Sequence, residues 1–221
     1  MADDSTELTG APTGAPVVHE RADAARNRRR ILTAARRLFG QRGVDTVTMD
    51  QIASAAGVGK GTLFRRFGDK SGLAAALLDE GERELREQVA RGPAPLGPGA
   101  APAERVRAFF DAYLTFLANH LDLVHLAETA RPGARYRITA YRYWHRHVAG
   151  LLADARLPAD GDALAHVLLA AVAADLQRAL REEVPAERMR RSVLLVIDAA
   201  VAAPVGAGTS GPGPSLWVQE G

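Results

Sequence analysis

Two short helical signals joined by a glycine-containing turn constrain the fold of this chain most strongly. The stretch TVTMDQIASAAGVGKGTLFRRFG covers residues 46–68. Thr48 and Gln51 fit a capping box, in which each side chain bonds the backbone N–H of the other residue at a helix start. The glycines within 57–59 end that helix, and a second short helix is predicted over 60–67. This pattern predicts a helix-turn-helix unit.

Helical periodicity continues on both sides of this unit. Apolar residues recur at helical spacing over 26–41, and a helix capped by Asp69 is predicted to reach residue 91. No stretch alternates as a strand does. The chain is therefore predicted to be all-α: an N-terminal three-helix helix-turn-helix domain, then a larger helical domain. After a Pro/Gly-rich loop at 92–102, we expect helices at 103–119, 121–130, 135–156, 162–182 and 187–203.

Charge divides the chain in the same way. Residues 20–70 carry 12 Lys and Arg against 5 Asp and Glu, a net charge of +7, whereas the whole chain carries +2. Such asymmetry favours a polyanion as the partner of the basic segment. We expect a disordered tail over 1–19, a basic helix-turn-helix domain over 20–70, a larger helical domain over 71–203 and a flexible tail over 204–221.

Composition and spacing exclude several functional classes. The 221 residues include no cysteine, so disulfides and thiolate metal sites are excluded. We find no signal peptide and no run of about 18 apolar residues, and we expect a cytoplasmic protein without a membrane segment. His145 and His147 point in different directions on a helix because they are two residues apart. We expect no metal site, no cofactor and no enzymatic activity.

The segment GVGKGT raises the question of a nucleotide phosphate loop. That motif requires a Ser or Thr after the lysine, and a strand before the loop. Here Gly61 follows Lys60, and a helix precedes them. A DNA-binding interpretation fits better, because an α-helix fits the major groove and glycines permit close backbone approach. Leu63 and Phe67 are expected to pack inward.

Residues 26–73, through ILTAARRLFGQRGVDTVTMDQIASAAGVGKGTLFRRFGDKSGL, closely resemble the DNA-binding domain of the TetR family of bacterial transcriptional regulators. The resemblance implies that 20–70 form a DNA-binding domain and 71–203 a ligand-binding and dimerisation domain. It also implies phosphate contacts from Thr48 and Lys70 and a DNA contact from Lys60. Three positions depart from the family pattern: Gly59 lacks a capping side chain, Phe64 lacks the usual Tyr hydroxyl, and Arg66 replaces a common His. Arg65 is a candidate for reading bases. The full set of DNA-binding candidates is Thr48, Gly59, Lys60, Gly61, Thr62, Phe64, Arg65, Arg66 and Lys70.

Aromatic residues gather in the larger domain, between 109 and 144. Apolar, aromatic-rich walls with a few polar groups are typical of ligand pockets, and ordinary core packing is the alternative. We expect a pocket for a small apolar or aromatic ligand. Its candidate lining residues are Phe109, Phe110, Tyr113, Phe116, Glu128, Tyr141 and Trp144.

Two stripes of small and branched apolar residues occupy the last two expected helices. The resemblance implies a two-fold dimer built as a four-helix bundle, and burial within one chain is the alternative. A homodimer would bind an inverted repeat in double-stranded DNA, because one unit alone reads one half-site. The interface candidates are Leu164, Leu168, Ala171, Asp175, Leu194, Ile197 and Val201.

We therefore expect a sequence-specific DNA-binding transcriptional regulator, a repressor released from its operator by a small-molecule ligand. Two alternatives remain open. One is a constitutive architectural DNA-binding protein without a ligand, and the other is a helical enzyme. A cavity among the aromatic residues would favour the regulator, and a solid core would favour the architectural protein.

Overall fold

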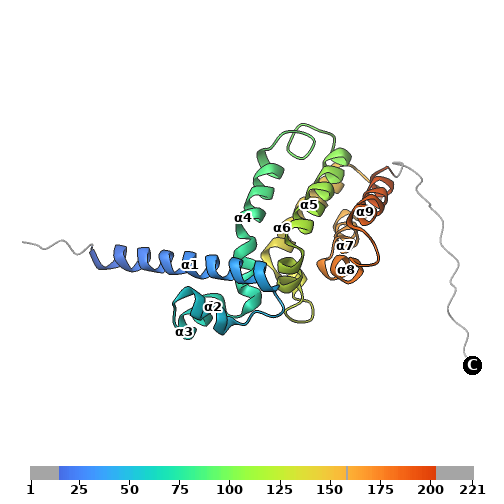
Figure 1. The fold of residues 1–221 in the computed structure, drawn as a ribbon. Helices are drawn as coiled ribbons and strands as arrows, with labels where there is room; N and C mark the ends of the chain where they lie inside the picture. Colours follow the sequence, from blue (N-terminus) through green and yellow to red (C-terminus); the bar gives the residue numbers. More distant parts are fainter. Residues whose placement is uncertain (1–14, 158, 203–221) are drawn as a thin grey trace, which may run out of the picture. The chain divides into compact units, whose positions relative to one another are not determined.

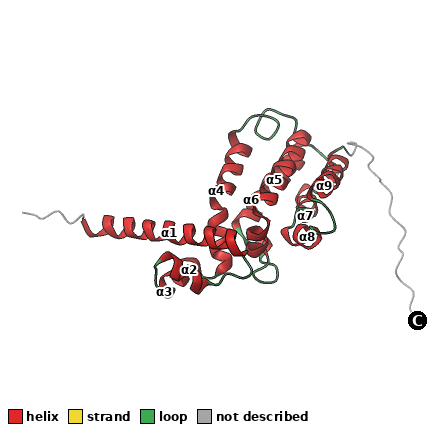
Figure 2. Ribbon diagram, in the orientation of Figure 1, coloured by secondary structure: helices red, strands yellow, loops and turns green. Residues whose placement is uncertain are grey.

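The computed structural model describes residues 15–157 and 159–202, and every regular element in these ranges is a helix (Figures 1 and 2). This confirms the all-α fold. The helices follow one another as α1 (Ala15–Arg42), α2 (Met49–Ala56), α3 (Lys60–Phe67), α4 (Lys70–Arg91), α5 (Pro102–Glu128), the 3-10 turn η1 (Arg135–Arg137), α6 (Thr139–Asp154), α7 (Gly161–Ala170), α8 (Ala174–Leu180) and α9 (Ala186–Val201).

The chain forms two compact units, and neither is a continuous segment. The first takes the described residues up to Asp79 together with Asp122–Ala130, and the second takes Glu80–Leu121 with the described residues from Arg131 onward. The boundary therefore crosses the interiors of α4 and α5. From charge, we expected one boundary between the two domains, after residue 70. The structure instead has boundaries after Asp79 and around the segment Asp122–Ala130.

The core of the first unit is built from one face of each of its helices. Ile31 on α1, Ile52 on α2 and Leu63 on α3 are fully buried. Leu123 and Leu126, from the carboxyl-terminal part of α5, pack against the same cluster. Burying a side chain of this size contributes about 1.5–3 kcal/mol, so these contacts fix α2 and α3 against α1.

Local signals set the ends of α2. The capping box is present: Thr48 Oγ1 accepts a hydrogen bond from Gln51 N–H at 3.2 Å, and Gln51 Oε1 accepts one from Thr48 N–H at 3.0 Å. Gly57 ends the helix with φ 60°, a left-handed conformation that favours glycine. The cap bonds at both ends of α2 thus come from residues nearby in the sequence.

The core of the second unit is aromatic. Phe109 and Phe110 on α5 and Trp144 on α6 are almost completely buried. Phe109 lies 5.3 Å from Phe110 and 5.5 Å from Trp144 between ring centroids. Aliphatic residues of α7 and α9 complete the same cluster, including Leu169 and Ile197.

Several helix boundaries differ from those expected. α1 begins at Ala15, so residues 15–19, expected to be disordered, are helical. α5, in contrast, is two helices that meet at a kink at His120 (φ −133°, ψ 17°), which agrees with the expected division into 103–119 and 121–130. The expected helix 135–156 begins as η1 before α6. The remaining terminal residues, 1–14 and 203–221, lie outside the described residues.

The expected helix 162–182 is two helices, α7 and α8. Ala173 has ψ 132°, which interrupts the helical path without a glycine or proline. Side chains satisfy the carbonyls near the end of α7: Arg135 donates to Leu169 O at 2.7 Å, and Gln177 donates to Ala171 O at 3.1 Å. Gly161–Leu180 is the one described stretch long and apolar enough to cross a membrane, and this break divides it. That composition alone is weak evidence for a span.

Candidate nucleic-acid interface

Helix α3 has one buried and one exposed face. Leu63 is fully buried and Phe67 partly buried, four residues apart and therefore on the same side. On the other side Lys60, Phe64 and Arg65 are exposed, and Phe64 keeps 39% of its surface. The inward positions of Leu63 and Phe67 agree with the sequence prediction. The exposed face offers cations and one apolar ring to a partner.

Lys60, the first residue of α3, is linked to α2. Its Nζ lies 2.7 Å from Asp50 Oδ2, and both side chains are more than half exposed. An ammonium group at a helix N-terminus is unfavourable to the helix dipole, and the carboxylate of Asp50 offsets this. A phosphate that binds Lys60 therefore competes with Asp50.

Lys70, the first residue of α4, holds the loop between α1 and α2. Its Nζ donates to the carbonyl oxygens of Val44, Asp45 and Val47 at 2.7, 3.3 and 3.1 Å. An ammonium group has three N–H donors, so these contacts use all of them. In this structure Lys70 stabilises the loop that leads to Thr48.

Two arginines of this unit also bond backbone carbonyls. Arg66 Nη1 donates to Ala24 O at 2.7 Å, and Arg30 Nη2 donates to Gly57 O at 3.2 Å. Arg65, in contrast, forms no hydrogen bond or ion pair with the described part of the chain. Its guanidinium is therefore ready to bind a partner, which favours Arg65 among the candidates for reading bases.

The remaining candidates of this surface are small. Gly59 caps α3 without a side-chain bond, as expected from its sequence. Gly61 is exposed with open space around its α-carbon, and Thr62 is partly buried. Thr48 is exposed, and its hydroxyl can donate a proton while its oxygen accepts the cap bond. These positions leave the backbone near the start of α3 accessible.

Helices α2 and α3 and the turn between them form a helix-turn-helix unit, and the exposed face of α3 is basic. Residues 31–77 match the family described as bacterial regulatory proteins, tetR family. Over these residues, which cover the helix-turn-helix unit, the chain is similar to the TetR family.

Individual relatives agree with this assignment. An HTH-type transcriptional regulator of Staphylococcus aureus (strain bovine RF122 / ET3-1) is 31% identical over 121 residues, 55% of this chain and 64% of that protein. The chain thus matches less than two thirds of that relative's length. Another HTH-type transcriptional regulator, of strain USA300, is 49% identical over 53 residues, 24% of this chain and 29% of that protein.

Solved structures share the fold over most of the chain. A TetR-family transcriptional regulator from Streptomyces coelicolor is 25% identical with a TM-score of 0.57, covering 80% of this chain and 95% of that one. One from Pectobacterium atrosepticum is 22% identical with a TM-score of 0.58, covering 81% and 94%, and supports the fold alone. The likeness extends well beyond the helix-turn-helix unit.

The aromatic pocket candidates pack against one another. Phe109, Phe110 and Trp144 form ring contacts in the core, and Tyr113 lies 5.8 Å from Phe109 between centroids. Phe116 is partly buried and packs against this core. Tyr141 also lines a hollow that His145 and His166 border. Glu128 is buried in the first unit, whereas the six aromatic candidates belong to the second. Core packing thus accounts for most of this group.

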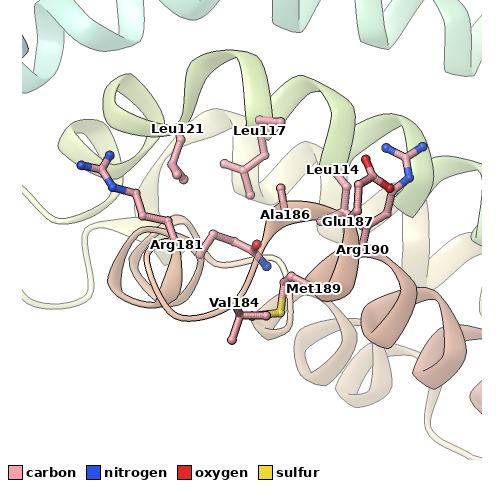
Figure 3. Close-up of a pocket in the computed structure, with 11 residues that line it drawn as sticks. Leu114, Leu117, Leu121, Arg181, Val184, Ala186, Glu187, Met189 and Arg190 are labelled. Atoms are coloured by element: carbon pink, nitrogen blue, oxygen red, sulfur yellow. The ribbon is translucent and has the colours of Figure 1, made fainter.

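A separate cavity of about 130 Å³ lies between α5 and the segment that joins α8 to α9. In Figure 3 the apolar side chains Leu117 and Leu121 face this segment, and Arg181 and Arg190 stand at opposite ends. A cavity of about 150 Å³ holds a benzene ring, so a group of about this size fits here. The sequence offered no signal for it, because its walls come from residues about 60 positions apart, such as Leu117 and Gln177.

The interface candidates divide between core and surface. Leu168, Leu194 and Ile197 are buried within the protomer's own core. The others, Leu164, Ala171, Asp175 and Val201, are partly buried or exposed. Three further apolar residues on α7 and α9 are strongly exposed: Val167 at 65%, Leu195 at 70% and Val196 at 53%. Packing within one protomer therefore explains the burial of Leu168, Leu194 and Ile197. Val167, Leu195 and Val196 remain exposed to solvent in the single chain.

Proposed function

We propose that this protein is a DNA-binding transcriptional regulator of the cytoplasm, whose α3 helix enters the major groove. The observation that carries the proposal is the exposed face of Lys60, Phe64 and Arg65 above the buried Leu63. Arginine can bind guanine with two hydrogen bonds, and Phe can contact the thymine methyl group. The family match over residues 31–77 supports the same role.

The regulator acts as a homodimer on an inverted repeat. The exposed apolar residues Val167, Leu195 and Val196 support this step, because apolar surface is stabilised when a partner removes it from water. α7 and α9 of two protomers would bury these residues in a four-helix bundle. Each protomer then presents one α3 helix to one half-site.

The proposed regulator is a repressor that a small molecule releases from DNA. The cavity beside Leu117 and Met189 supports this step, since it combines apolar walls with charged groups. A structural neighbour from Saccharomonospora viridis, 24% identical, is in complex with choline. The packed aromatic core favours a second candidate, a constitutive DNA-binding protein without a ligand.

Selection of double-stranded DNA from a random pool by the full chain tests DNA binding. We expect an inverted repeat. Arg65→Ala should weaken binding to it at least about fivefold, which corresponds to the loss of one base contact. Arg91→Ala is the matched control, because Arg91 is an exposed arginine of the second unit paired with Glu87.

Two results would contradict the proposal. One is a pool without any enriched sequence, and the other is equal weakening by both substitutions, which would indicate a non-specific charge effect. Compounds that bind the wild-type protein separate the two candidate functions. A repressor loses DNA affinity when they bind, and a constitutive protein keeps it.

A further inference from the structure

Three side chains able to bind a metal meet in the second unit. His145 belongs to α6, and Asp162 and His166 belong to α7. One donor atom of each lies within 4.8 Å of the other two. We propose that His145, Asp162 and His166 bind a divalent first-row transition-metal ion. This site is independent of the proposed DNA-binding function.

Helix packing brings the three residues together. Asp162 and His166 are four residues apart in the first turns of α7, so their side chains lie on the same face. α6 packs along α7 and places His145 beside them. Spacing along the sequence predicted no metal site here, because it compares residues within one helix. The third ligand comes from another helix.

The separation of the donors suits a small cation. His145 Nε2 lies 3.6 Å from Asp162 Oδ1. Two ligands bound tetrahedrally at about 2.0–2.1 Å from a zinc ion are about 3.3 Å apart. His145 Nε2 also lies 3.1 Å from the backbone oxygen of Asp162, and metal binding would replace this hydrogen bond.

The two imidazole rings lie side by side. Their centroids are 3.8 Å apart, and the angle between their planes is 26°. Nearly parallel rings direct their lone pairs alongside one another, so binding requires the His145 ring to turn until its nitrogen and that of His166 converge on the ion. The outer torsion of a histidine side chain is broad, and this rotation costs little. The site is therefore close to, but not yet in, a coordinating geometry.

Tyr141 orients His166. The Tyr141 hydroxyl lies 2.6 Å from Nδ1 of His166. When Nε2 of His166 binds the ion, Nδ1 carries the proton and donates to the tyrosine oxygen, an arrangement typical of metal-binding histidines. Tyr141 is itself held in place, because it is 95% buried and the Arg135 guanidinium lies 5.2 Å from its ring centroid. We assign Tyr141 as a positioning residue.

The surroundings define the class of ion. A hollow of about 580 Å³ borders the three side chains and gives water access to the remaining coordination positions. Two imidazoles and one carboxylate favour Zn²⁺, Co²⁺ or Ni²⁺, whereas Ca²⁺ and Mg²⁺ require more oxygen ligands. Arg142 and Arg146 also line the hollow and oppose a cation, although solvent screens these exposed groups.

Titration of the tag-free, chelator-treated full chain with Zn²⁺ tests the site, with heat as the readout. We expect saturation at one ion per chain. His166→Gln and Asp162→Asn should each weaken binding at least about tenfold. Asp160→Asn is the control for the carboxylate, because Asp160 caps α7 and Asn caps as well. His120→Gln is the control for the imidazole.

Circular dichroism establishes that each variant is folded. Tyr141→Phe gives a second measure, since it keeps the ring and removes only the hydroxyl that orients His166. It should also weaken binding. The proposal is wrong if the wild type does not bind Zn²⁺, or if His166→Gln, Asp162→Asn and Tyr141→Phe all bind it as tightly as the two controls.

Discussion

His147 shows how one buried side chain can make stability depend on pH. It lies on α6, with its ring centroid 5.3 Å from that of Phe109, and its Nε2 is buried without a hydrogen-bond partner among the described residues. Burial, and then the nearby positive charge of Arg105, lower the pKa of His147 from 6.5 to about 4. The neutral imidazole is therefore the form that fits the fold.

The lowered pKa predicts a loss of stability in acid. Between pH 6.5 and about 4 the unfolded chain binds a proton at His147 that the folded chain does not. The melting temperature should therefore fall across this window. The melting temperature of His147→Gln should fall less over the same range, because glutamine has no group to protonate. Thermal unfolding from pH 7 to 4 measures both, and parallel curves would show that His147 contributes nothing.

Residue-level features near α2 and α3 were readable from the sequence. The capping box at Thr48, the inward position of Leu63 and the missing side-chain cap at Gly59 depend only on neighbours in the chain. The histidine and aspartate group was not readable, because His145 and His166 meet only when α6 packs on α7. Local chemistry could be predicted, and contacts between helices could not.

At the scale of elements, basic side chains connect the pieces of the first unit. Arg30 joins α1 to the end of α2, Arg66 joins α3 to α1, and Lys70 joins α4 to the loop after α1. From the sequence, Lys70 was expected to contact phosphate, and Arg66 was a DNA-binding candidate. The structure adds a second role for each, because charged donors bond backbone carbonyls more strongly than neutral ones do.

Lys70→Met should therefore destabilise the protein without DNA. It leaves the carbonyls of Val44 and Val47 without their ammonium donor, at a cost of about 1–3 kcal/mol. Lys60→Met is the matched control, because it also removes one charge but breaks only an exposed ion pair, worth about 0–1 kcal/mol. Urea unfolding of both variants measures the difference. Equal free energies of unfolding would exclude the loop-holding role.

The break between α7 and α8 was the least predictable feature of the elements. The interruption between α7 and α8 occurs among alanine and valine, which carry no stop signal. It is compatible with side-chain bonds from Arg135 and Gln177, which lie outside α7. Tertiary contacts therefore overrode the continuous apolar pattern of 162–182.

At the scale of the whole molecule, the exposed apolar face of α7 and α9 predicts the assembly. Leu195→Glu should give a monomer at micromolar concentration, because it places a charge in the proposed four-helix bundle. Phe64→Glu, the matched control, makes the same change at an exposed apolar residue of α3 and should remain dimeric. Sedimentation equilibrium measures both.

A dimeric Leu195→Glu protein would place the interface elsewhere. A charged residue at the interface candidates Leu168 or Ile197 should act differently from Leu195→Glu. Both are buried in the protomer's own core, so we expect a charge there to unfold the chain before it separates two copies.

The discontinuous make-up of the first unit sets a condition for exchanging parts between relatives. Leu123 and Leu126 complete the core that supports α2 and α3, yet they follow the first part of the unit by more than forty residues. A hybrid regulator that takes only the amino-terminal helices of another family member would combine two cores that were never matched. The end of α5 must be transplanted with them, so the proposed DNA-binding surface depends on two separate pieces of the chain.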